Sequence, residues 1–82
     1  MINVLYFAWV RERIGLPREE IETNAQTVRE LIAELSAREE RYAAAFEDLK
    51  SLRVAVDQEL VDFDASLSGV REVAFFPPMT GG

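Results

Sequence analysis

The residues best suited to chemistry are the last two of the sequence, Gly81 and Gly82. Because glycine has no Cβ, this end of the backbone can enter a channel too narrow for side chains, and its terminal carbonyl carbon is open to attack from either side. A free carboxylate is ionised at neutral pH and is a poor electrophile. We therefore expect another enzyme to activate Gly82, most simply as an acyl adenylate made from ATP.

The preceding residues, Pro77, Pro78, Met79 and Thr80, predict a stalk that carries the two glycines away from the fold. Proline fixes φ near about −65° and holds the residue before it extended, so the chain should leave the domain without folding back. From residue 77 to residue 82 the tail can reach roughly 20 Å, which is enough to enter another protein. The alternative is a frayed end without function, and the strand-like run before the prolines argues against it.

The composition leaves little room for a catalytic centre on the chain itself. None of the 82 residues is Cys or His. Their absence removes thiol nucleophiles, disulfides, thiolate metal sites and the usual side chain for proton transfer at neutral pH. We therefore expect no bound cofactor, no metal site and no self-contained enzyme.

Charge and hydropathy narrow the partners and the compartment. The net charge of −6 should repel a nucleic-acid backbone and an anionic membrane surface. The apolar opening, MINVLYFAWV, has no basic leader and is too short to span a bilayer, so a cytoplasmic location is expected. With 49% hydrophobic and 29% charged residues, the chain should fold as one domain.

The elements that position the tail are predicted to be strands with one main helix. Residues 2–9 are rich in β-branched and aromatic side chains and predict a strand. Gly15 and Pro17 predict the turn of a hairpin, with a second strand over residues 19–23. Further strands are expected over residues 52–58, 59–63 and 71–76, from their alternation of apolar and polar side chains.

A helix is predicted to begin after Thr27, which forms a capping box with Glu30. Its apolar stripe is Val28, Leu31, Ile32 and Leu35. A stripe at this spacing is suited to lie across a sheet, and Tyr42, Phe46 and Leu49 predict a second helical segment after it. The fold class is therefore α+β, a mixed sheet with one main helix packed across it, over residues 1–76, followed by the tail, residues 77–82.

Alternation also predicts a partner surface on the sheet face away from the helix. The side chains on this face should be Leu5, Phe7, Trp9 and Phe76, with Leu60 near them. A contiguous apolar patch on a small protein marks a docking site. The other reading is that the second helical segment covers these aromatics and makes them part of the core; alternation alone does not decide between the two.

Three segments carry a family resemblance: VLYFAWVRERIG, VAVDQELVDFDASL and above all REVAFFPPMTGG. They resemble the small subunits of molybdopterin synthase, which are ubiquitin-like β-grasp sulfur carriers, and the resemblance spans essentially the whole chain. It implies that an adenylyltransferase related to ubiquitin-activating enzymes adenylates Gly82 with ATP. A sulfurtransferase step then converts Gly82 to a thiocarboxylate, a 1-thioglycine, with Gly81 beside it.

The resemblance also implies the later steps and the assembly. The tail enters the large synthase subunit, and its sulfur attacks a cyclic pyranopterin precursor to build the dithiolene of molybdopterin. The catalytic side chains belong to the large subunit, so the chain is a sulfur donor within a heterotetramer that holds two copies of each subunit. The residues that the resemblance assigns to partner binding are Phe7, Arg11, Leu60, Phe76, Pro77, Pro78, Met79 and Thr80.

One segment departs from the family pattern, because Val70 and Arg71 stand where relatives have a turn richer in Gly and Asp. Acidic residues around the tail exit, including Glu72, are a further weak signal, since they could steer the chain toward a basic mouth on its partners.

Three other functions stay open at this stage. One is the sulfur carrier of thiamine synthesis, which shares the fold and the Gly-Gly end but is shorter and lacks the FFPP run. Another is a ubiquitin-like protein modifier, for which Lys50 is the only lysine acceptor on the chain. The third is a plain interaction module whose patch binds a partner and whose tail has no role.

Overall fold

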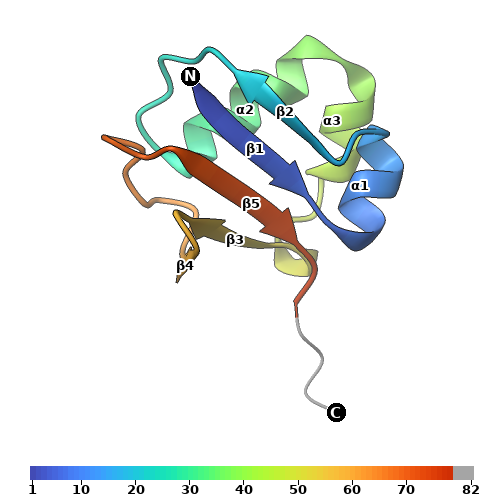
Figure 1. The fold of residues 1–82 in the computed structure, drawn as a ribbon. Coiled ribbons are helices and arrows are strands. Elements are labelled where there is room, and N and C mark those ends of the chain that lie inside the picture. The colour runs from blue at the N-terminus through green and yellow to red at the C-terminus, as the bar shows by residue number, and fades with distance from the viewer. Residues whose placement is uncertain (79–82) are drawn as a thin grey trace.

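The computed structural model describes residues 1–78 and shows a five-stranded mixed sheet with its helices on one face (Figure 1). In chain order the elements are β1 (Ile2–Tyr6), α1 (Ala8–Ile14), β2 (Arg18–Ile21), α2 (Val28–Arg38), α3 (Glu40–Ala45), the short 3-10 helix η1 (Leu49–Ser51), β3 (Arg53–Val56), β4 (Glu59–Val61) and β5 (Glu72–Phe76). The strand order is β2-β1-β5-β3-β4, with β1 and β5 parallel and the other pairs antiparallel. The predicted α+β, ubiquitin-like β-grasp fold is confirmed.

The core lies between the sheet and the helices. The stripe predicted for α2 is buried at all four positions, Val28, Leu31, Ile32 and Leu35. From the sheet, Tyr6 and Phe75 stack with their ring centroids 6.3 Å apart, and Phe46 meets Phe75 edge-on at 4.9 Å. Because buried aromatics contribute large contact areas, these three rings anchor the C-terminal end of α3, the predicted second helical segment, to the strands β1 and β5.

The start of α2 shows the predicted cap with one difference. The Glu30 N–H donates to Thr27 Oγ1 at 3.2 Å, as a capping box requires. The Glu30 carboxylate reaches one residue further back than expected, and accepts from the Gln26 N–H at 3.4 Å and from the Thr27 hydroxyl at 3.4 Å. The prediction of the helix start is confirmed.

The first predicted strand is too long, because β1 ends at Tyr6 and α1 begins at Ala8. Ala8 has φ of 52°, in the left-handed region, and this turns the chain out of the sheet. Val10 and Ile14 are buried four residues apart, which is helical spacing. The alternating apolar residues before them predicted a strand instead and hid this helix in the sequence. The prediction of a simple hairpin turn between the first two strands is therefore wrong. The two strands do pair antiparallel, but α1 lies between them in the chain and is capped by Gly15, whose φ is 88°.

Candidate functional site

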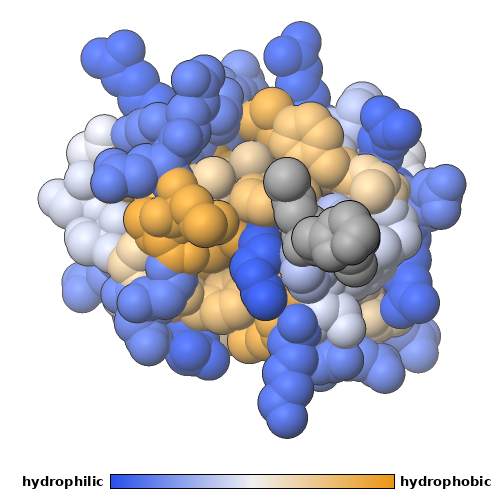
Figure 2. Space-filling model, turned by 90° about the horizontal axis from the view of Figure 1, so that it is seen from below, coloured by the Kyte–Doolittle hydropathy of each residue, from blue (hydrophilic) through white to orange (hydrophobic). Residues whose placement is uncertain are grey.

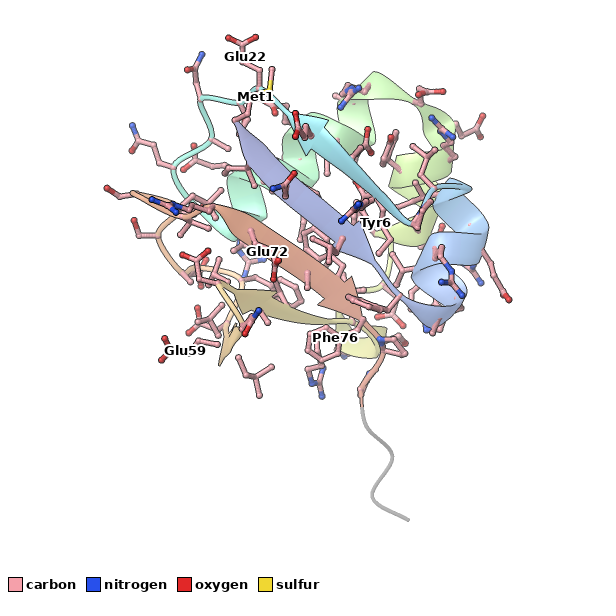
Figure 3. All side chains as sticks on the ribbon, viewed as in Figure 1. Met1, Tyr6, Glu22, Glu59, Glu72 and Phe76 are labelled. Carbon is pink, nitrogen blue, oxygen red and sulfur yellow. The ribbon has the colours of Figure 1, made fainter. Side chains whose placement is uncertain are left out.

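The tail leaves from the centre of the sheet. β5 lies between β1 and β3 and ends at Phe76, and Pro77 and Pro78 follow outside the ladder. Figure 3 shows Phe76 at the end of β5 where the chain continues into the tail. The remaining predicted site residues, Met79, Thr80, Gly81 and Gly82, lie outside the described residues. The root of the tail is therefore fixed by pairing on both sides of β5.

The open face of the sheet, away from the helices, is arranged in three rows. Residues that pair directly across strands point to the same face, so each row runs across the sheet. The middle row runs Leu60, Ala55, Ala74, Leu5, Arg18. The row nearer the tail holds Arg53 and Phe76, and the row at the other end holds Glu72, Asn3 and Glu20. Hydrophobic side chains thus gather toward the tail end of this face, and carboxylates gather toward the opposite end.

We define the open-face patch as Leu5, Phe7, Ala55, Leu60, Ala74 and Phe76. Phe7 is 45% exposed and Leu60 is 66% exposed, while Phe76 is half-buried. The second helical segment packs on the other face of the sheet, so it does not cover Phe7 or Phe76. Figure 2 shows the hydrophobic surface, in orange, at the end of the molecule from which the tail leaves. Whether the patch binds a partner stays a prediction.

Phe7 is held by its backbone on two sides. Its N–H donates to the Phe75 carbonyl at 3.1 Å, which continues the pairing of β1 with β5 for one residue. Its carbonyl accepts from the N–H groups of Val10 and Arg11, at 3.1 and 3.4 Å, at the start of α1. Together with the left-handed conformation of Ala8, these bonds fix the backbone of Phe7, from which the exposed ring projects. Arg11 is exposed on the same helix.

Trp9 is not part of the open-face patch, in contrast to the prediction from alternation. It lies on α1, packs partly buried against the core and has the Arg13 guanidinium 5.1 Å from its ring centroid. It lines a hollow on the helix side of the molecule with Ala44 and Asp48. The strand ends before Trp9, so the alternation that assigned its face does not apply to it.

Glu72 lies at the wrong end of β5 to steer the tail. It begins the strand that Phe76 ends (Figure 3), and the rise of four residue steps along the strand places their Cα atoms about 13 Å apart. Asp57 stabilises the start of β5, because its carboxylate oxygen Oδ1 accepts from the N–H groups of Arg71 and Glu72 at 3.1 and 3.0 Å. The turn that holds Val70 and Arg71 is therefore fixed by a residue of the turn between β3 and β4.

A polar cluster on the helix side was missed from the sequence. The hydroxyls of Tyr6 and Tyr42 both donate to Glu19 Oε2, at 2.8 and 2.5 Å. Burial, and next the bond to Glu19, raise the pKa of Tyr42 to about 12, and the same causes raise the pKa of Tyr6. The one sequence signal for this cluster was Glu19, a charged residue at an inward-facing position of the second strand, since the two tyrosines lie far from it in the sequence. The cluster links β1, β2 and α3.

Neither a group of side chains placed to hold a metal ion nor a membrane-spanning helix is found in the described part of the chain. Among residues 1–78, no group of three or more Cys, His, Asp and Glu side chains is placed to hold a metal ion. No helix within that range is long and apolar enough to cross a membrane. The open-face patch and the tail root therefore remain the candidate site.

Comparison with known proteins gives matches over the whole chain. The profile of the ThiS family matches residues 4–82. The molybdopterin synthase sulfur carrier subunit of Escherichia coli (strain K12) is 49% identical over 82 residues, and that of Haemophilus influenzae is 38% identical; both alignments cover all of both chains. A solved structure from Pyrococcus furiosus, titled putative molybdopterin converting factor, subunit 1, matches with a TM-score of 0.72 at 30% identity, over 95% of this chain and 97% of that one.

Proposed function

The chain belongs to the ThiS family, and from that membership we propose that it is the sulfur carrier subunit of a molybdopterin synthase. The observation that carries the proposal is the 49% identity to a carrier of that name over the whole of both chains. The fold supports it, because the central strand β5 ends beside an exposed apolar patch and leads directly into the glycine tail. The end of β5 and the surface that docks the chain therefore lie on the same side of the fold.

The chemistry of loading takes place at Gly82. Its carboxylate attacks the α-phosphorus of ATP, so that an acyl adenylate forms and pyrophosphate leaves. A donor that supplies sulfur at the oxidation level of sulfide then attacks the carbonyl carbon and displaces AMP, which gives the thiocarboxylate. An adenylyltransferase and a sulfurtransferase supply these steps, since the chain has no Cys or His of its own.

Delivery takes place in the large synthase subunit. The thiocarboxylate sulfur bonds to a carbon of the cyclic pyranopterin precursor as an oxygen substituent leaves that carbon. Water then cleaves the acyl–sulfur bond, which leaves sulfur on the precursor and returns Gly82 to its carboxylate form. Two such deliveries build the dithiolene. We place the chain in a cytoplasmic heterotetramer with two large subunits, docked through Phe7, Arg11, Leu60 and Phe76.

The experiment is the intact mass of the chain, purified from its own host and again after incubation with the activating enzyme, ATP and a sulfur donor. We expect the mass to rise by the difference between one sulfur and one oxygen, localised by fragmentation to Gly82. Transfer to the pyranopterin precursor by the large subunit should then return the mass to its first value. An unchanged terminus, under conditions in which the Escherichia coli relative is loaded, would overturn the proposal.

A further inference from the structure

Arg53 stands directly beside the tail root. It pairs with Phe76 across β3 and β5, so the two side chains point to the same face with their Cβ atoms about 5 Å apart. Its Nη1 donates to the carbonyls of Leu52 and Lys50, at 2.8 and 3.4 Å, at the end of η1. These bonds hold Nη1 of an exposed side chain, and Nε and Nη2 make no hydrogen bond within residues 1–78.

The charge of Arg53 has no carboxylate partner among residues 1–78. The ion pairs in that range are Arg29 with Asp64 and Arg41 with Glu39. Asp62, the residue after β4, makes no ion pair with Arg53, and its Oδ1 accepts from the Asp64 N–H at 2.9 Å. A guanidinium that is anchored at one edge and unpaired at the other is prepared to receive an anion from outside.

The surroundings of Arg53 indicate a protein surface as the source of that anion. The side chain borders a hollow that is largely apolar. Leu60, Val61 and Phe63 line it, together with the carboxylate-bearing Asp62. Phe76 lies on its other side. A nucleic acid would meet the net charge of −6, whereas a protein surface with apolar side chains for the hollow and a carboxylate at its rim matches both features.

We propose that Arg53 binds an aspartate or glutamate of the large synthase subunit, at the border of the surface that covers the open-face patch. This inference rests on the proposed function and specifies the chemistry of the partner. The anchored guanidinium donates two parallel N–H bonds to the carboxylate, and this pairing fixes the rotation of the carrier about its tail as well as adding affinity. Arg53 is then a specificity-determining residue, since apolar contacts alone do not set orientation.

The test compares Arg53→Gln with Arg71→Gln in binding to the large subunit of the same organism. Arg71 is a matched control, because it is an exposed arginine at the opposite end of β5. At low salt we expect Arg53→Gln to weaken binding about tenfold and Arg71→Gln to change it by less than about twofold. Arg53→Lys should recover only part of the loss, because a point charge lacks the fork.

The salt dependence separates an ion pair from a structural effect. Loss of an ion pair should flatten the fall of affinity with added salt, whereas damage to η1 would lower affinity equally at all salt concentrations and lower the melting temperature. The inference is overturned if Arg53→Gln binds like Arg71→Gln, or if its loss does not depend on salt. If the wild-type chain itself does not bind the large subunit, the proposed function fails instead, and this inference fails with it.

Discussion

The hydroxyl of Tyr42 in α3 donates to the carboxylate of Glu19 in β2 at 2.5 Å. Tyr6 of β1 donates to the same oxygen at 2.8 Å, so one half-buried carboxylate satisfies two hydroxyls of otherwise buried tyrosines. The sheet edge and the second helical segment are joined by this carboxylate. Removing Glu19 should lower stability by more than these two bonds add to it, because a buried hydroxyl without a hydrogen-bond partner costs more free energy than a formed bond contributes.

Glu19→Ala is therefore expected to lower the free energy of unfolding by about 2–4 kcal/mol, since it orphans both hydroxyls. Glu20→Ala is the matched control, because Glu20 is the next residue of the same strand but is exposed on the other face. Its effect should stay within about 0.5 kcal/mol. Urea unfolding of the three chains measures both values, and equal losses would show that the cluster contributes no more than a surface charge.

The raised pKa of Tyr42 makes stability fall at high pH. The pKa of a free tyrosine is about 10, whereas the pKa of Tyr42 in the folded chain is raised to about 12. Between these values the unfolded state has lost the proton and the folded state keeps it, so the unfolded state binds fewer protons and the free energy of unfolding decreases as pH rises. The contribution is complete below pH 10 and is lost toward pH 12.

Tyr42→Phe checks this assignment. The variant should be about 1 kcal/mol less stable than wild type at neutral pH, because a hydrogen bond to a charged group is lost. Its stability should then fall less steeply than that of wild type above pH 10, with Tyr6 accounting for the slope that remains. Denaturant unfolding at a series of pH values gives both slopes. Identical slopes would assign the alkaline transition to other groups.

Most of the fold could be predicted from the sequence, because local periodicity and core burial agree in it. The stripe of α2, its cap at Thr27 and the inward positions of β3 follow rules that act within a few residues. The end of β1 could not be predicted, since the kink at Ala8 depends on a left-handed backbone that alanine does not favour. Tertiary bonds from Phe7 to β5 and α1 hold it.

The candidate site divides in the same way. Alternation placed Phe7 on the open face without deciding whether it is exposed, and the tail was evident from its residue types. The position of Glu72 and the place of Arg53 beside Phe76 depend on which strands are neighbours and in which direction they run. The parallel pairing of the first and last strands is a tertiary feature, so charge near the tail could not be located from residue numbers.

Phe76→Ala and Phe75→Ala separate docking from folding on one strand. Phe75 is fully buried and its loss should cost about 3–5 kcal/mol of stability. Phe76 is half-buried on the open face, so its loss should cost about 1 kcal/mol of stability while binding to the large subunit weakens by about 2 kcal/mol or more. Thermal unfolding and calorimetric binding measure the two effects.

The ratio of the two losses decides the role of Phe76. A core residue loses stability first, and binding falls only as the folded fraction falls. A docking residue loses affinity while the chain stays folded at the temperature of the binding measurement. Equal losses of stability and affinity in Phe76→Ala would place this side chain in the core and leave Phe7 and Leu60 as the remaining docking candidates.

Deletion of Gly81 and Gly82 tests whether the tail has a function at all. Strand β5 ends at Phe76, before the two deleted residues, so the truncated chain should keep its melting temperature within about 2 °C. It should lose all sulfur loading and all synthase activity. A second variant with one alanine added after Gly82 keeps both glycines but moves the carboxylate, and it should also fail to load. If the truncated chain keeps full activity, the tail is dispensable, and the open-face patch alone is the function of an interaction module.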